Sequence, residues 1–158
     1  MGRVGREVIG DTIHSVLEDL NKAAAAELHD AFRYQLLAKM AQGMNAPDVA
    51  SWFQTTAQDE WAHLGKLIER IVILGGHPFT QLEQASSLSY APYMDPPEDP
   101  TDLRKMISDS LEGERSAIRF YSDLYHKTQR ADPITAALAQ QMIADEVSDE
   151  DDLEKFLA

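Results

Sequence analysis

The segment Asp59-Glu60-Trp61-Ala62-His63 places a carboxylate and an imidazole three residues apart, in a stretch whose apolar spacing predicts a helix. Residues three apart share one face of a helix, so Glu60 and His63 could bind the same ion. A Glu-x-x-His pair is weak evidence alone, because most such pairs are solvated. Its significance depends on whether other segments carry acidic residues at matching places.

Each of the four long helical segments carries an acidic residue on its apolar stripe, where the core is expected. A buried carboxylate must be protonated, paired or bound to a metal, and few basic residues are near enough to pair with these. A bound cation cluster is therefore predicted. Glu150 is a rival to Asp149, because it also falls near the fourth stripe and has a longer side chain, but register favours Asp149. The candidate metal ligands are Glu27, Glu60, His63, Glu114, Glu146 and Asp149.

The candidate ligands are expected at one height in the bundle. Glu27 and Glu60 lie about equally far from the turn near residue 45, and Glu114 and Glu146 about equally far from the turn near 131. The helical rise then brings each pair to nearly the same level. The two halves of the chain also share a spacing: Tyr34 lies seven residues after Glu27, and Tyr121 lies seven residues after Glu114.

Four long helices are predicted to position these residues. They cover roughly 11–43, 47–74, 101–131 and 132–157, with Gly, Asn and Pro at their boundaries. No strand pattern competes. Residues 1–10 are expected to be a loose lead-in, and 76–100, with five of the seven prolines, a long crossover with room for a helical turn around 80–88. The predicted fold class is all-α: two antiparallel helical hairpins joined by a long crossover, in one domain over 1–158.

Composition narrows the classes of function. Acidic residues outnumber basic ones 27 to 14, and the formal charge of −13 makes DNA binding an unfavourable hypothesis. The absence of cysteine excludes disulfides, iron–sulfur clusters and thiol catalysis. No signal peptide or membrane-spanning stretch is evident, so a cytoplasmic protein without membrane contact is predicted. Trp52 and Trp61 are interpreted as packing residues, and His29 as lying off the acidic stripe.

These motifs resemble the ferritin-like superfamily, nearest to bacterioferritins and to Dps-like proteins with a bacterioferritin-type di-iron site. The resemblance covers essentially 11–157. It implies that Glu27 and Glu114 are terminal ligands, that Glu60 and Glu146 bridge two irons, and that His63 is a nitrogen ligand of one iron. It also makes Tyr34 a candidate redox or hydrogen-bonding group beside the site, and Tyr121 a candidate hydrogen-bonding group.

The sequence departs from this family at three points. Asp149 stands where a second His is usual, which predicts an all-oxygen second metal site that is more permissive toward manganese. Trp61 stands where bacterioferritins have a haem-ligating Met, so no haem is predicted. The chain ends after the fourth helix, which favours a dimer or a twelve-subunit shell over a twenty-four-subunit one.

The function expected from this resemblance is ferroxidase activity, an enzymatic oxidation of Fe²⁺ to Fe³⁺ by O₂ or H₂O₂. It would serve iron storage, detoxification and protection against oxidative stress in a hollow homo-oligomer. Two iron ions per subunit are expected, with manganese or zinc as other occupants. The alternatives are a di-manganese, catalase-like peroxide scavenger and a non-catalytic metal-binding or scaffold bundle in which Asp149 has impaired the site.

Overall fold

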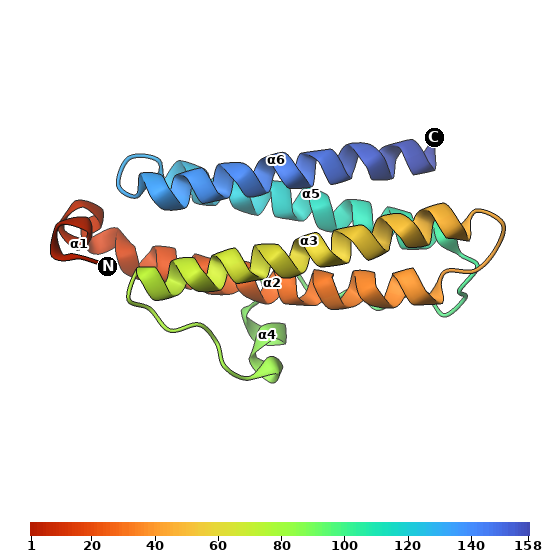
Figure 1. The fold of residues 1–158 in the computed structure, drawn as a ribbon, viewed down its shortest axis with the longest axis horizontal. Helices are drawn as coiled ribbons and strands as arrows, with labels where there is room; N and C mark the ends of the chain where they lie inside the picture. The colour runs from red at the N-terminus through yellow and green to blue at the C-terminus, as the bar shows by residue number, and fades with distance from the viewer.

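The computed structural model describes all residues from 1 to 158, and every regular element in it is helical (Figure 1). Four long helices form the bundle, and shorter helices lie at the N-terminus and in the crossover. The elements are α1 (Arg3–Ile9), a 3-10 turn η1 (Gly10–Thr12), α2 (Ile13–Met40), α3 (Ala46–Ile73), α4 (Leu82–Leu88), α5 (Leu103–Thr128) and α6 (Pro133–Leu157).

The bundle consists of two antiparallel hairpins, α2 with α3 and α5 with α6, and the predicted fold class is confirmed. Helix α3 ends at the opposite end of the molecule from the start of α5, so the crossover runs the length of the bundle (Figure 1). No helix combines the length and the apolarity that crossing a membrane requires.

Local sequence explains where the long helices begin and end. Asp102 caps α5, because its side chain accepts a 2.9 Å hydrogen bond from the backbone nitrogen of Lys105. Asp132 caps α6 in the same way and accepts a 3.1 Å hydrogen bond from the backbone nitrogen of Thr135. Pro133 then occupies the first turn of α6, where no backbone donor is needed. Gly75, just after α3, has a φ of 84°, which favours glycine at a helix end.

The N-terminal segment is more regular than the sequence predicts. Residues 1–10 were expected to be a loose lead-in, but Arg3–Ile9 forms α1, and Ile9 packs into the main core. The crossover contains α4, which packs against α2 and lies where a helical turn is expected around 80–88. A short helix in such a position depends on tertiary contact, because isolated segments of this length are not stable helices.

The apolar core is divided into two clusters along the bundle axis. One contains Leu20, Leu67, Tyr121 and Met142 with their neighbours, towards the N-terminal end of α2. The other is centred on Phe53, Met106, Leu153 and neighbouring residues, towards the C-terminal end of α2. On every long helix, the predicted ligands lie between the residues that contribute to the two clusters.

A buried ion pair joins the two hairpins near the α5–α6 turn. Arg70 of α3 donates from Nη2 to Asp132 Oδ1 at 2.6 Å and from Nε to Thr135 Oγ1 at 2.8 Å. Arg70 is only 6% exposed and Asp132 only 1%. Burial alone would raise the pKa of Asp132, but the hydrogen bonds from Arg70 and Thr135 outweigh it and lower that pKa.

Replacing Arg70 with Met should strongly destabilise the protein, because the Asp132 carboxylate would stay buried without its cation. We expect a loss of about 3–5 kcal/mol in the free energy of unfolding. Urea denaturation at fixed protein concentration, followed by circular dichroism, measures it. Lys155→Met is the control: its partners Asp151 and Asp152 are exposed, so the loss should stay below about 1 kcal/mol. Equal losses in the two variants would contradict this account.

Candidate metal centre

The six predicted ligands converge between the two apolar clusters. Five of them, all except Asp149, are between 1% and 3% exposed, and Asp149 is half-buried. Each long helix contributes at least one of these side chains. The result is an acidic layer across the middle of the bundle, with apolar packing on both sides.

The ligand atoms form two overlapping groups. Glu27, Glu60, His63 and Glu146 have one ligand atom each within 4.8 Å of one another, and so do Glu60, Glu114, Glu146 and Asp149. Glu60 and Glu146 belong to both groups. Two cations held in this way would share two carboxylates, which is the arrangement of a dinuclear centre built from facing helices.

Glu150 lies outside both groups. Its carboxylate accepts a 2.8 Å hydrogen bond from Arg115 Nε, and Arg115 also pairs with Glu154. The register argument that favoured Asp149 over Glu150 therefore agrees with the positions of both side chains.

His63 is held between the cluster and Asp145. Its Nδ1 lies 3.0 Å from Glu60 Oε2 and 3.6 Å from carboxylate oxygens of Glu27 and Glu146. Its Nε2 lies 3.1 Å from Asp145 Oδ2. The Asp145 carboxylate can accept a hydrogen bond from an Nε2–H group, which leaves Nδ1 facing the cluster as the atom available to a cation.

The two tyrosines brace the terminal carboxylates crosswise. Tyr34 of α2 donates a hydrogen bond to Glu114 Oε1 of α5, and Tyr121 of α5 donates one to Glu27 Oε1 of α2. Burial, followed by the charge of the nearby carboxylates, raises the pKa of both tyrosines well above the usual value. Both phenols therefore stay protonated and act as donors at neutral pH.

The charge of the cluster is not balanced by the protein. Burial and the neighbouring carboxylates raise the pKa of Glu60 and of Glu146 well above the usual range. Neither carboxylate oxygen of Glu146 has a hydrogen-bond partner, although both are buried. Burial lowers the pKa of His63, but its contacts with Glu27 and Asp145 outweigh burial and raise it. Cations would neutralise this excess negative charge and supply Glu146 with its missing partners.

A surface cleft reaches the His63 side of the cluster between α3 and α6. It has a volume of about 280 Å³, and its lining includes His63, Asp149, Asp145 and Asp59. Lys66 also lines this opening, but the three carboxylates outnumber it, so the cleft attracts cations and offers them a short path from the surface to the ligands.

Sequence reasoning missed three residues near the centre. Asp145 could have been recognised, because it precedes Glu146 as Asp59 precedes Glu60.

Arg33 is 1% exposed and donates from Nη1 to Ser110 Oγ and from Nε to the Met94 carbonyl, both at 2.8 Å, which ties the crossover to α5. Burial and the charges of Glu114 and Glu27 raise the pKa of Asp30 well above its usual value. Asp30 and Arg33 are three residues apart, a spacing typical of surface ion pairs, and nothing in the sequence marks them as interior.

Comparison with known proteins agrees with the fold. A family profile described as the ferritin-like domain of ferritin matches residues 17–158, so the chain belongs to the ferritin-like family. A DNA protection during starvation protein from Pyrococcus furiosus is 28% identical over 151 residues, covering 96% of this chain and 81% of the relative. A bacterioferritin from Desulfovibrio desulfuricans is 40% identical over 68 residues, covering 43% of this chain and 38% of the relative.

Solved structures give the same fold. A bacterioferritin-related protein from Bacteroides fragilis, described as a dodecameric thioferritin, superposes with a TM-score of 0.93 at 24% identity, covering 99% of this chain and 93% of that one. The Dps protein of Thermosynechococcus elongatus gives a TM-score of 0.86 at 18% identity, covering 98% and 95%. The resemblance to the ferritin-like superfamily, drawn from the sequence motifs, is confirmed.

The metal-free protein should lose stability as pH rises. Burial and the charges of Glu114 and Asp59 raise the pKa of Asp149 from 3.8 to about 7. Between these two pH values the folded protein keeps a proton on Asp149 that the unfolded chain has lost. The free energy of unfolding therefore falls as pH rises through this range. The raised pKa of His63 acts in the same direction. We expect the thermal midpoint of unfolding to be lower at pH 7.5 than at pH 5. The difference between the two midpoints should be smaller in Asp149→Asn. Adding Zn²⁺ at pH 7.5 should raise the wild-type midpoint again. A midpoint that rises with pH in metal-free protein would contradict the assignment.

Comparing Asp149→Ala with Glu150→Gln tests the second ligand group. We expect wild type to bind two Co²⁺ ions per chain, Asp149→Ala to lose the weaker one, and Glu150→Gln to keep both, because Glu150 is occupied by Arg115. Anaerobic titration followed by visible absorption measures the stoichiometry. Loss of an ion in Glu150→Gln but not in Asp149→Ala would reverse the assignment.

Proposed function

We propose that this protein is a ferroxidase that binds two Fe²⁺ ions as substrate and oxidises them to Fe³⁺ with O₂ or H₂O₂. The observation that carries the proposal is the pair of overlapping ligand groups that share Glu60 and Glu146. Two carboxylates common to both groups hold two ions close together, so one oxidant molecule can take an electron from each.

The ligand set favours the oxidised product. The two groups contain five carboxylates and one imidazole, in an interior from which water is largely excluded. Negative oxygen ligands stabilise a trivalent ion more than a divalent one, which makes electron loss easier. With H₂O₂, two Fe²⁺ ions give one electron each, and two protons complete the reduction of peroxide to two water molecules.

The positions of the side chains support the following proposed roles. Glu27 and Glu114 are terminal ligands held by Tyr121 and Tyr34, and Glu60 and Glu146 bridge the two ions. His63 completes the first group and Asp149 the second. Because Tyr34 donates directly to Glu114, it is also placed to supply an electron to the oxidised centre.

We further propose that the chain forms a hollow homo-oligomer that stores the ferric product and consumes peroxide, in the cytoplasm. The description of the Bacteroides fragilis structure as dodecameric supports a twelve-subunit assembly. The net charge of −13 argues against DNA as a partner, whatever the name of the Pyrococcus relative.

One observation favours manganese as a second substrate or occupant. The group of Glu60, Glu114, Glu146 and Asp149 offers only oxygen ligands, which suit manganese as well as iron. A di-manganese centre that disproportionates peroxide is therefore the second candidate. It predicts O₂ release from H₂O₂ by manganese-loaded protein.

Anaerobic loading with Fe²⁺ followed by addition of O₂ or H₂O₂ tests the proposed activity. We expect prompt oxidation of two Fe²⁺ ions per chain, followed by absorption of the ferric product. Glu60→Gln should slow oxidation about 100-fold or more, because both ions lose a bridging ligand. Glu112→Gln, an exposed change on α5, is the control and should react as wild type does. Wild-type protein that binds iron but shows no faster oxidation than iron in buffer would refute the proposal.

A further inference from the structure

A small cavity lies beneath the crossover on the α2–α5 side of the bundle, whereas the acidic cleft opens between α3 and α6. Its volume is about 20 Å³, which is room for one water-sized molecule. Residues 89–94 of the crossover form one of its walls, and each of them is half-buried or exposed. A single layer of the chain therefore separates the cavity from solvent.

Asp30 lies between this cavity and the metal centre. It is in α2, one turn after Glu27 and one turn before Tyr34, and its side chain lines the cavity. Glu27 and Tyr34 are only 2% and 1% exposed, whereas Asp30 is half-buried. Asp30 belongs to neither ligand group. It is therefore an acid beside the centre that metal binding leaves free.

The lining of the cavity offers hydrogen-bond partners to a small polar molecule. His29 lines it with Asp30, and the Nδ1 atom of His29 is buried without a hydrogen-bond partner. Burial lowers the pKa of His29, so its ring is neutral at physiological pH. A water molecule in the cavity would have the His29 ring and the Asp30 carboxyl group as partners, and a buried water needs at least two.

Asp30 keeps its proton to a higher pH than a surface aspartate does. Burial and the charges of Glu114 and Glu27 raise its pKa well above the usual value, and the charge of Arg33 opposes them only in part. The charge of Asp30 in turn helps to raise the pKa of three surrounding tyrosines, which are Tyr34, Tyr90 and Tyr93. These phenols hold their protons at neutral pH, so Asp30 is the acid on this side that can give one up.

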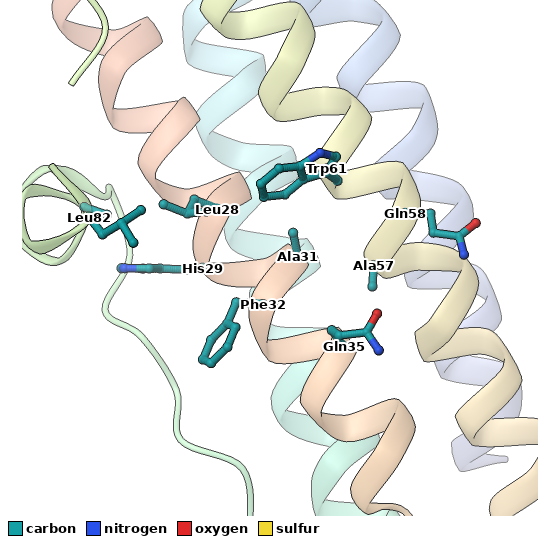
Figure 2. Close-up of a pocket in the computed structure, with 10 residues that line it drawn as sticks. Leu28, His29, Ala31, Phe32, Gln35, Ala57, Gln58, Trp61 and Leu82 are labelled. Carbon is teal, nitrogen blue, oxygen red and sulfur yellow. The ribbon is translucent and has the colours of Figure 1, made fainter. Parts of the chain in front are cut away.

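The other hollow beside His29 provides no such group. Figure 2 shows an apolar groove between α2 and α3, beside α4, with Ala31, Ala57 and Trp61 around it. Its volume is about 580 Å³, and none of its lining residues is Asp, Glu, Lys or Arg. An apolar surface has no group that can pass a proton on. Of the two hollows that His29 lines, only the cavity therefore offers a path for protons.

We propose that Asp30 passes protons between solvent and the metal centre through a water molecule held in the cavity beneath the crossover. The proposal rests on the ferroxidase function proposed above. Two Fe²⁺ ions give one electron each to H₂O₂, its O–O bond breaks, and two protons complete two water molecules. Asp30 gives a proton towards the centre and regains one from the water in the cavity, which takes one from solvent. Protons and Fe²⁺ then enter from different sides, so these like charges do not compete for one path.

Asp30→Asn tests the relay, because asparagine keeps the size of the side chain and cannot give up a proton. We expect the variant to bind two Co²⁺ ions per chain and to oxidise Fe²⁺ with H₂O₂ roughly 100-fold more slowly. Replacing H₂O with D₂O should slow the variant by a larger factor than wild type, since proton delivery now limits the rate. Asp123→Asn, an exposed change on α5, is the control and should react as wild type does. An unchanged rate, or a slower rate without the larger isotope effect, would overturn the proposal.

Gly113→Ala tests the cavity. Gly113 lines it from α5, and a Cβ atom there would lie 3.6 Å from Met94 Cε, an ordinary contact. Alanine favours a helix more than glycine does, so we expect a higher thermal midpoint together with slower oxidation, a combination that damage to the fold cannot produce. Gly65→Ala on α3, where a Cβ atom meets nothing within 4 Å, should gain stability and keep the wild-type rate. Equal rates in the two variants would contradict the proposed route.

Proton release on Zn²⁺ binding separates this inference from the proposed activity. Metal ligands lose protons when a cation binds, whether or not the protein oxidises iron. In weakly buffered solution with a pH indicator, we expect Asp30→Asn to release as many protons as wild type, but more slowly. Slower release by the variant, with no iron oxidation by wild type, would refute the ferroxidase function and leave the proton route standing. Release at the wild-type rate, with prompt oxidation by wild type, would do the reverse.

Discussion

The acidic layer between the two apolar clusters is the constraint on which the rest of the structure depends. Four glutamates and one histidine are almost fully buried there, and removing charged groups from water costs several kcal/mol each unless they are compensated. Contacts with neighbouring side chains offset part of this cost. Two tyrosines donate to Glu27 and Glu114, and His63 contacts Glu60, whereas neither carboxylate oxygen of Glu146 has a hydrogen-bond partner. Cations bound here would supply the compensation that the protein leaves out.

The hydrogen bonds from the two tyrosines are arranged symmetrically. The residues three positions after Glu60 and Glu146 are not equivalent, because one is His63 and the other is Asp149. Each hairpin supplies a tyrosine to the other hairpin's glutamate, as an approximate two-fold relation requires. On one side, Asp145 accepts from His63, a favourable contact. On the other side, Asp59 faces Asp149 across the cleft, and its charge is among the causes that raise the pKa of Asp149. A cation would therefore relieve more repulsion in the second group of residues than in the first.

The bundle and the clustering of the six acidic and histidine side chains could be predicted because both depend on helical periodicity. Acidic residues on four apolar stripes, at equal distances from two turns, meet wherever those helices pack. Arg33 and Asp30 could not be predicted in the same way, since their burial depends on the crossover that covers them. Helix α1 has a similar cause, because Ile9 is buried by the core it packs against. Trp61 was interpreted as a packing residue but is 63% exposed, because an apolar residue on a helix does not by itself reveal whether the fold covers it.

Helix α3 separates two surfaces of opposite character. Along a few residues it presents Glu60 and His63 to the interior, Asp59 to the acidic cleft, and Trp61 to the uncharged groove. Apolar residues at the cleft would remove its attraction for cations. The division of charge around this one helix thus keeps the carboxylates at the cleft apart from the apolar groove.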